Sequence, residues 1–548
     1  MTRTIYRAGL AAVLLSGTLA DSIALAQDGQ TQPVAERTVA DSAGQTSGEK
    51  TFVVTAYGAV GDGIADDTPA IQRAIDAAAK SAGGGIVYFP ARTYLLNSCY
   101  ASPHPWFFYN LLIGSNITLS GQKGAKLLQG PSGRHPLPAQ ATEVRNTMLA
   151  FGLDYTTIRF QNTKYNGGFY SLKPTQANAA TVTFAKAQDA AHFAAGDYVA
   201  IYAQTSGDVI PTETSWIASV DASNGVLRLK TSLARSFSTP SVAKVTSLVT
   251  THIGVKNLIV QGTEPLAVTE AFEFSAEDNQ FILDTAPGGS NVTGLNLNTL
   301  NGFQFIRDTI TCIGPQFSLL ELPQRNSQNG VLEGSTFEVK QMGMGEYAAH
   351  WRFTNNRFML HPDKNTAVAL GIGGLDIDFR HNQVQGGNLT GGGGFGSLMA
   401  DYMGPDSYAS HVGKIRIADN IITCQADGNS CLGIFAQDTV VTGNKITVKG
   451  SGAGIHAEGP LPQSLTINNN TLSMDSGRGM VIVTPERDGS TIVGNTLTGS
   501  ASAVGIFVAS PRTPNAGGHT ISNNTIRGFA TPVSIDLAKH PGTKLSSD

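Results

Sequence analysis

The sequence has 548 residues, of which 14% are charged, and its formal net charge is -4. A weakly acidic chain of this kind lacks the basic surface that nucleic-acid binding requires, so a nucleic-acid partner is not expected. Its 62 glycines predict many tight turns, and its 41% hydrophobic residues are sufficient for a large buried core.

The N-terminus has the pattern of a signal peptide. Arg3 and Arg7 precede an apolar stretch over residues 8–20, and the small-residue pattern of residues 24–26 follows. The apolar stretch is shorter than the about 20 residues that a membrane-spanning helix needs. We therefore expect a secreted or periplasmic protein that is cut after Ala26 and has no membrane span.

The folded part is expected to begin near residue 51. Residues 27–50 are polar and show no apolar periodicity, which predicts a disordered linker. Residues 51–54 are strand-like. Apolar residues then recur at helical spacing from Ile71 to Ala78.

This predicted helix has signals at both ends and a strand after it. The residues that can cap its N-terminus are Asp66, Asp67 and Thr68. Gly83, Gly84 and Gly85 are expected to end it, and residues 86–89 are expected to form the next strand.

Residues 56–72, AYGAVGDGIADDTPAIQ, together with residues 83–90, GGGIVYFP, and with Thr93 and Tyr94, resemble the opening segment of the pectate lyase superfamily. That superfamily includes many proteins related to the polygalacturonases. The resemblance implies an all-β fold, a right-handed parallel β-helix, whose N-terminal end is closed by the capping helix. In this family the segment is architectural and carries no chemistry.

Internal repetition supports a solenoid independently. A polar anchor residue precedes the last strand of each unit, and successive anchors lie about 25 residues apart. The anchors are Asp308, Ser335, Asn356, Asn382, Asn420, Asn444, Asn470, Asn495 and Asn524. Three short strands in each unit describe one coil of a triangular solenoid. Asparagine tolerates left-handed turns, and stacked amides at one corner can form a hydrogen-bonded ladder.

The coil rhythm stops between residues 171 and 247, where β-like segments predict a small inserted domain. This insertion either flanks the substrate or serves only for packing. The expected divisions are a cap with first coils over 51–170, the insertion over 171–247, coils over 248–538 and a flexible tail over 539–548.

The chain has four cysteines, and an exported protein can form disulfides. Cys424 and Cys431, separated by a short loop, are the expected pair; the alternative is buried free thiols. No spacing of cysteine and histidine indicates a metal site, and no cofactor is expected.

The resemblance to polygalacturonase-like proteins implies that the catalytic groups lie on the short strand before the buried alternating strand. These short strands are expected at residues 318–322, 346–350, 367–372, 397–402, 432–437 and 454–458. Alternation turns every second side chain outward. The side chains expected to face outward are Glu321, Asp401, Phe435, Gln437, His456 and Glu458.

Asp401 and Glu458 would then lie two coils apart, about 10 Å between backbones. This is near the carboxyl separation of an inverting glycosidase, about 6.5–9.5 Å. We interpret them as acid and base, assisted by His456 and Tyr402. In a lyase, Tyr402 or His456 would instead remove a proton beside a uronate carboxyl group.

The anchors Asn382 and Asn420 lie 38 residues apart, so this coil carries a long loop. Long solenoid loops often form a binding rim, which makes Tyr408 a substrate-binding candidate. The alternative is a solvated loop with incidental polar residues.

A further set of charged residues lies on the buried alternating strands: Arg352, Asp376, Asp378 and Arg416. Opposite charges on adjacent coils mainly predict a solvent-facing salt ladder. The alternative is a catalytic pair of Asp376 and Asp378, with the arginines binding substrate. Weaker candidates are Glu321 with Arg325, and Glu346 with His350.

Known catalytic patterns are absent after the opening segment: the sequence has no Asp-Asp pair, Gly-His-Gly or Arg-Ile-Lys of polygalacturonases, and no Tyr-Gly-Phe-Asp-Pro-His of alginate epimerases. The leading hypothesis is an inverting glycoside hydrolase acting on a polysaccharide bound along the β-helix. The alternatives are a polysaccharide lyase and a non-catalytic glycan-binding or surface-structural solenoid. The sequence predicts no oligomeric state.

Overall fold

The computed structural model describes residues 49–546, within one compact unit, except for the gaps 102–106, 135–144, 152–169, 204–211, 245–249, 285–291, 294, 313–317, 322–326, 340, 344–347, 362–369, 373, 387–388, 392–412, 426–429, 435, 437, 459–463, 484–488, 502 and 510–517. No helix among these residues is long and apolar enough to cross a membrane.

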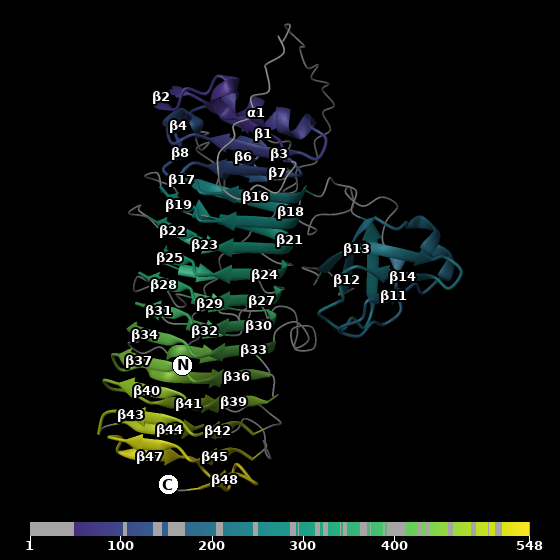
Figure 1. Ribbon diagram of the computed structural model, residues 1–548. Helices are drawn as coiled ribbons and strands as arrows, with labels where there is room; N and C mark the ends of the chain where they lie inside the picture. Colours follow the sequence, from purple (N-terminus) through teal and green to yellow (C-terminus); the bar gives the residue numbers. More distant parts are fainter. Residues whose placement is uncertain are drawn as a thin grey trace, which may run out of the picture. The chain divides into compact units, whose positions relative to one another are not determined.

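The capping helix α1 (Thr68–Lys80) forms where the apolar spacing predicts it, and its apolar face is buried. Asp66 accepts a hydrogen bond from the backbone N–H of Thr68 at 3.1 Å. Asp67 instead accepts bonds from the N–H groups of Val60 and Gly61, so it ties the preceding loop to the helix. Figure 1 shows α1 at the end of the stack of strands.

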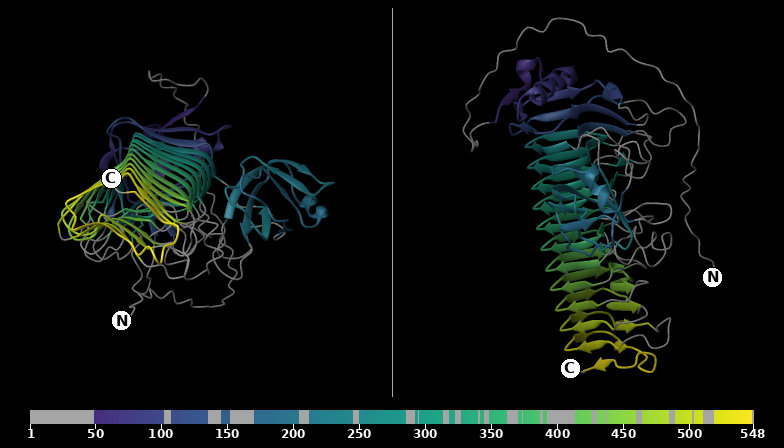
Figure 2. Two further views of the ribbon diagram at one scale, coloured as in Figure 1. Left: turned by 90° about the horizontal axis from the view of Figure 1, so that it is seen from below. Right: turned by 90° about the vertical axis from the view of Figure 1, so that its right-hand side faces the viewer.

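The chain winds into coils that contribute strands to three sheets, which are parallel apart from the antiparallel pairing of Tyr100–Ala101 with the following strand, and the predicted right-handed parallel β-helix is confirmed (Figures 1 and 2). We call the strands that lead to the anchor residues sheet A, those that follow the anchors sheet B, and the short third strands sheet C. Parallel pairing in register makes equivalent side chains of successive coils form rows about 4.8 Å apart.

Sheet A contains β1 (Thr51–Val53), β3 (Gly85–Phe89), β5 (Tyr100–Ala101), β6 (Phe107–Ile113), β7 (Ile117–Gly121), β9 (Arg145–Phe151), β16 (Thr250–Lys256), β18 (Glu264–Glu277), β21 (Leu295–Ile306), β24 (Gln328–Glu333), β27 (Ala349–Thr354), β30 (Leu375–Arg380), β33 (Gly413–Ala418), β36 (Thr439–Thr442), β39 (Leu465–Asn468), β42 (Thr491–Val493), β45 (Thr520–Ser522) and β48 (Lys544–Leu545).

Sheet B contains β2 (Asp62–Asp66), β4 (Thr93–Leu96), β8 (Lys126–Gln129), β17 (Ile259–Gly262), β19 (Gln280–Leu283), β22 (Thr309–Cys312), β25 (Thr336–Val339), β28 (Arg357–Leu360), β31 (Gln383–Gln385), β34 (Ile421–Gln425), β37 (Lys445–Lys449), β40 (Thr471–Met474), β43 (Thr496–Thr498) and β46 (Thr525–Arg527).

Sheet C contains β20 (Val292–Thr293), β23 (Ser318–Glu321), β26 (Gln341–Gly343), β29 (Leu370–Ile372), β32 (Leu389–Gly391), β35 (Ser430–Ile434), β38 (Ala453–Glu458), β41 (Met480–Val483), β44 (Val504–Val508) and β47 (Thr531–Ser534). Short 3-10 turns are η1 (Val54–Tyr57), η2 (Pro131–Gly133) and η3 (Ala187–His192).

The anchor residues form a buried ladder between sheets A and B. The Asn444 amide oxygen accepts from the Asn420 backbone N–H at 3.0 Å and from its Nδ2 at 2.9 Å, while Asn444 Nδ2 donates to Ile417 O at 2.9 Å. The ladder also includes Asn279, which the repeat pattern missed. The left-handed turn belongs to the residue before each anchor, as at Asp419, where φ is 54°.

Other residues fill the places in sheet C that were predicted for two short strands. Residues 346–350 were expected in sheet C, but β26 fills that place and His350 lies in β27 of sheet A. Residues 397–402 were expected between β29 and β35 in sheet C. That place is filled by β32, which pairs with both of these strands. The prediction failed because β32 lies in a glycine-rich stretch that reads as a loop.

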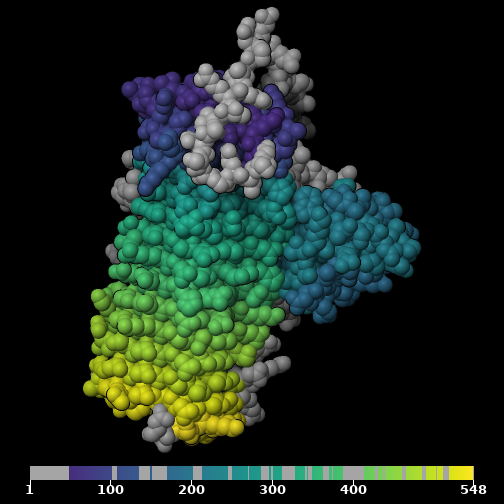
Figure 3. Space-filling model, in the orientation of Figure 1, coloured from purple at the N-terminus to yellow at the C-terminus, as the bar shows by residue number. Residues whose placement is uncertain are grey.

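The insertion is an antiparallel sheet with its own apolar core, which includes Phe184, Ile201 and Phe237. Its strands are β10 (Tyr170–Ser171), β11 (Thr181–Thr183), β12 (Tyr198–Ala203), β13 (Thr212–Asp221), β14 (Val226–Leu229) and β15 (Pro240–Lys244). Hydrogen bonds join it to the coils of sheet A through Asn301 and Gln328, and Figure 3 shows it in blue against the side of the stack.

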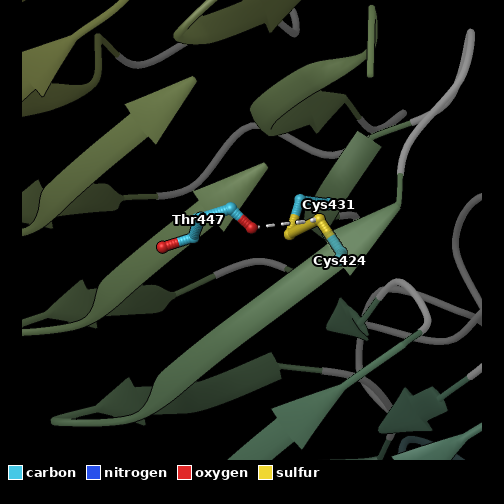
Figure 4. Close-up of a disulfide and its surroundings, with 3 residues drawn as sticks. All are labelled: Cys424, Cys431 and Thr447. Carbon is cyan, nitrogen blue, oxygen red and sulfur yellow. Dashed lines mark hydrogen bonds between the residues drawn. A yellow bond between two sulfur atoms is a disulfide. The ribbon is translucent and has the colours of Figure 1, made fainter. Parts of the chain in front are cut away.

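The expected disulfide joins Cys424 to Cys431, with 5.7 Å between their Cα atoms. Cys424 lies on β34 and Cys431 on β35, and Thr447 O lies 3.8 Å from the Cys424 sulfur (Figure 4). The bond therefore connects a sheet B strand to the sheet C strand of the same coil.

Candidate functional site

The outer face of sheet A carries a row of charged side chains. Alternation buries Trp351, Ile377 and Ile415 in the core and turns their neighbours outward. The register places Arg352 beside Asp378, and Asp378 beside Arg416, on the adjacent strands β27, β30 and β33. These residues do form one row across three coils, as the sequence predicted.

The contacts within this row differ from the predicted salt ladder. Among the described residues, the ion pair of Asp378 runs along its own strand to Arg380, at 3.0 Å. Residues two apart on a strand point to the same face, so this pair forms without reaching another coil. Arg352 and Arg416 are exposed on either side of the Asp378 carboxylate.

A second row begins the same strands. His350, Asp376 and Lys414 each adopt a left-handed conformation, with φ of 56°, 59° and 54°. His350 Nδ1 lies 2.6 Å from Asp376 Oδ2, and the side chains are 33% and 58% exposed. The structure thus brings together His350 and Asp376. The sequence had suggested Glu346 as the partner of His350, and Asp378 as the partner of Asp376.

This contact has a chemical consequence. When the Nδ1–H of neutral His350 donates a hydrogen bond to the Asp376 carboxylate, Nε2 is the ring nitrogen with the free lone pair and is the basic one. A base held by a carboxylate is the arrangement used for general base catalysis. Arg352 on the same strand, with Lys414 and Arg416 on β33, adds exposed positive charge near the pair, and Asp378 lies between the two arginines. Such cations suit an acidic substrate.

A second pair of histidine and carboxylate lies on β38 of sheet C. His456 Nε2 is 3.4 Å from Glu458 Oε2, with side-chain exposures of 28% and 38%. Ile455, just before His456, and Ala457, between His456 and Glu458, are both buried. Alternation therefore predicted the outward direction of His456 and Glu458 correctly. Burial lowers the pKa of His456, and the nearby Glu458 carboxylate partly offsets this, which favours a neutral imidazole.

The predicted partner of Glu458 lies outside the described residues. β32 fills the place two coils before β38 in sheet C, and the expected spacing of Asp401 and Glu458 stays a prediction. Asp401, Tyr402 and Tyr408 lie outside the described residues.

The remaining candidates are not brought together by the described structure. Glu321 ends β23, where only its backbone is described. Four lie outside the described residues: Arg325, Glu346, Phe435 and Gln437.

Sequence reasoning missed a buried ion pair near His350. Glu213 Oε1 lies 3.3 Å from Arg235 Nη1, and the two side chains are 2% and 0% exposed. Burial raises the pKa of Glu213, and the Arg235 charge and the Ala234 N–H oppose that rise. Both residues lie in the insertion, 22 positions apart, where no sequence pattern indicated that they meet.

Comparison with known proteins supports the fold assignment. Residues 51–191 match the family described as rhamnogalacturonase A/epimerase, pectate lyase-like. A 40-residue stretch is 72% identical to plasmin and fibronectin-binding protein A of Streptococcus pneumoniae, covering 7% of this chain and 6% of that protein. A 43-residue stretch is 63% identical to mannuronan C5-epimerase AlgE1 of Azotobacter vinelandii, covering 8% and 3%. The chain therefore spans only a small part of these curated relatives.

Solved structures match over most of the chain. The tailspike protein gp49 from Pseudomonas phage LKA1 has a TM-score of 0.58 at 14% identity, with coverage of 88% of this chain and 83% of that one. The Gp54 tailspike of Acinetobacter baumannii bacteriophage AP22, solved with a capsular saccharide, has a TM-score of 0.52 at 11% identity, with coverage of 88% and 76%. The resemblance to pectate lyase-like β-helix proteins is thereby confirmed for the fold.

Proposed function

We propose that this chain is an exported protein that binds an acidic polysaccharide along the outer face of sheet A and cleaves it by β-elimination. The observation that carries the proposal is the 2.6 Å contact of His350 Nδ1 with Asp376 Oδ2. Arg352, Lys414 and Arg416 lie on the same or an adjacent strand and supply positive charge for uronate carboxylates.

The proposed reaction uses the basic nitrogen of His350. The proton on the carbon beside the uronate carboxyl group moves to His350 Nε2, and the C–H electron pair forms a carbon–carbon double bond. The glycosidic C–O bond on the next carbon breaks, and the departing oxygen takes a proton from His350 or from water. A cation beside the uronate carboxylate stabilises the negative charge that develops when the proton leaves.

The relatives support the choice of a polysaccharide. One similar tailspike was solved with a capsular saccharide, and one curated relative is a mannuronan C5-epimerase. An epimerase at C5 and a lyase both begin by removing the proton from that carbon, so the same kind of base serves either reaction.

The decisive experiment compares two matched histidine variants on acidic polysaccharides. His350→Gln removes the proposed base, and about 100-fold or more of the turnover should be lost. His252→Gln is the control, because exposed His252 pairs with Glu273 in the same manner but four coils away. The product should absorb ultraviolet light as an unsaturated uronate. Equal turnover in the two variants would reject His350 as the base.

The second candidate function is inverting hydrolysis, with Glu458 and Asp401 as the acid and base. It is favoured by the outward, half-exposed Glu458 carboxylate next to His456. New reducing ends without an unsaturated product, lost in Glu458→Gln and kept in His350→Gln, would select it. Binding of polysaccharide without any product would select the non-catalytic alternative.

Export is part of the proposal and rests on the signal-peptide pattern of residues 1–26. These residues lie outside the described structure. Sequencing the N-terminus of protein recovered from outside the cytoplasm should find Gln27 first. Recovery of the intact N-terminus from an exporting host would contradict cleavage after Ala26.

A further inference from the structure

The insertion is attached to the coils by buried polar contacts. The Thr214 carbonyl of β13 accepts hydrogen bonds from Asn301 Nδ2 at 2.9 Å and from Gln328 Nε2 at 3.0 Å. These two side chains belong to β21 and β24, and both are buried. Trp216 of β13 packs edge-to-face on Phe272 of β18, with 5.8 Å between the ring centroids. The insertion is therefore fixed against several coils.

Its contact with the next coil uses the buried ion pair. The Glu213 carboxylate accepts the backbone N–H groups of Ala234 at 2.6 Å and of Arg235 at 3.0 Å, and it pairs with Arg235 Nη1. This arrangement shapes the loop at Ala234 and Arg235 and orients the guanidinium. Arg235 Nη2 then donates to Ala348 O at 3.1 Å.

The Ala348 carbonyl is a junction between the two strands that carry the candidate base pair. It also accepts the backbone N–H of Leu375 at 2.9 Å. Ala348 lies two residues before His350, and Leu375 lies one residue before Asp376. One carbonyl oxygen therefore joins the insertion to both strands immediately before the imidazole and its carboxylate.

Apolar packing holds the same point. Ala234 of the insertion forms a small buried cluster with Ala349 and Leu375, which directly precede His350 and Asp376. The fixed backbone determines where these two side chains leave it, because both residues adopt the left-handed conformation in which few side-chain directions are open. The position of the pair is thus set from the insertion side as well as by the coils.

We propose that Glu213 and Arg235 are positioning residues, through which the insertion holds His350 and Asp376 in contact. The proposal rests on the function proposed above, in which His350 is the base. In this proposal the insertion serves to position the base and its carboxylate, and it need not bind substrate itself. Arg235 acts through the Ala348 carbonyl, and Glu213 acts through Arg235.

The test measures His350 directly, so that it does not depend on finding a substrate. Diethyl pyrocarbonate modifies exposed imidazoles, and mass spectrometry of the peptides gives the rate at each histidine. In Arg235→Gln the rate at His350 should rise several-fold, because the imidazole loses its fixed carboxylate partner. The rate at His252, which pairs with Glu273 four coils from His350 and beside the insertion's separate contact at Phe272, should stay unchanged and serves as the internal reference.

A matched variant separates positioning from docking. Gln328→Met removes one insertion contact on β24 and leaves Arg235 and Ala348 unchanged. It should leave the His350 rate at the wild-type value, while Arg235→Lys, which keeps the charge but not the planar fork, should give an intermediate rate. Melting curves of each variant confirm that the folded state is present. Equal rates at His350 in Arg235→Gln, Gln328→Met and wild type would overturn the proposal.

Turnover supplies the second readout. On a cleaved polysaccharide, Arg235→Gln should lower kcat by about 100-fold with KM nearly unchanged, because substrate contacts on other coils remain. If the wild type cleaves no polysaccharide, the proposed function fails, but the modification rates still decide whether the insertion positions His350. A change in KM alone, with an unchanged His350 rate, would show that the insertion binds substrate instead.

Discussion

Asp308 occupies a position in the buried ladder where most coils have asparagine. Its Oδ1 accepts the Asn279 N–H at 2.8 Å and Asn279 Nδ2 at 2.9 Å, as an asparagine oxygen would. Among the described residues, its buried Oδ2 has no hydrogen-bond partner. Burial raises the pKa of Asp308 to about 7. The ladder therefore favours a neutral side chain at this position, which asparagine provides at every pH.

Asp308→Asn should stabilise the protein most at alkaline pH. The pKa of Asp308 is higher in the folded state than its ordinary 3.8, so its contribution to stability is lost as pH rises from about 4 through 7. The variant should gain about 1–3 kcal/mol at pH 8 and much less at pH 4. Urea unfolding of the variant and the wild type at pH 8 and at pH 4 measures this difference in the free energy of unfolding. The control is Asp419→Asn, an exposed residue outside the ladder, and a gain independent of pH would contradict the explanation.

At the scale of elements, prediction depended on how regular each pattern was. The capping helix and the anchored strands could be predicted because periodicity and repeated asparagines determine them locally. β32 could not, because its three residues, Leu389–Gly391, lie among glycines and are held by pairing with β29 and β35. The sequence therefore predicted residues 397–402 for the place that β32 fills.

The candidate site was only partly predictable for a related reason. The sequence identified His350 as a weaker candidate beside Glu346, and Asp376 as a member of a charged, solvent-facing row. Their contact depends on the left-handed conformation of the second residue of each strand and on the register of β27 and β30, neither of which appears in the residue pattern. Arg235 reaches Ala348, two residues before His350, only through the docking of the insertion.

The last coil is closed by a pair of buried histidines. Ser490 N–H donates to His519 Nδ1 at 3.0 Å, His519 Nε2 lies 3.3 Å from His540 Nδ1, and His540 Nε2 lies 3.0 Å from Ala509 O. This chain of contacts requires both rings to be neutral. Burial, with a smaller effect from His540, lowers the pKa of His519 to about 4.

Acid should therefore loosen the C-terminal coil first. The pKa of His519 is lower when folded than its ordinary 6.5, so its contribution to stability is present above pH 6.5 and is lost as pH falls toward 4. By pH 4.5 the loss should reach about 2 kcal/mol. At pH 4.5, exchange of the backbone amide hydrogens of Lys544 and Ser546, corrected for intrinsic rates, should be faster relative to that of Thr471 in the middle of the stack. Uniform acceleration along the chain would argue against a local effect.

At the scale of the whole described stack, each coil pairs only with the coil before it and the coil after it, as β36 does with β33 and β39. Stability is then approximately a sum of contributions from coils and from their interfaces. Rows of side chains continue across coils, so a polymer lying along sheet A can meet several charged positions in succession. Single substitutions should therefore weaken binding of long polymers less than binding of short ones.

The disulfide strengthens one coil within this stack. Replacing both cysteines, Cys424→Ser with Cys431→Ser, should cost about 2 kcal/mol, the loop entropy expected for their separation of 7 residues. Hydrogen exchange should rise in β34, β35 and the coils paired with them. Thermal unfolding of the oxidised and reduced wild type gives the same comparison without mutation, and identical curves would show that the bond adds no stability.

The insertion contacts four consecutive coils through Phe272, Asn301, Gln328 and Ala348, and its apolar cluster with Leu375 extends to a fifth. Coils beyond it can separate one after another when force is applied to the C-terminal end, and each step lengthens the chain by about 25 residues. The five bridged coils share a common brace and must yield in a single larger step. An extension trace should thus show a regular series of small ruptures followed by one at higher force.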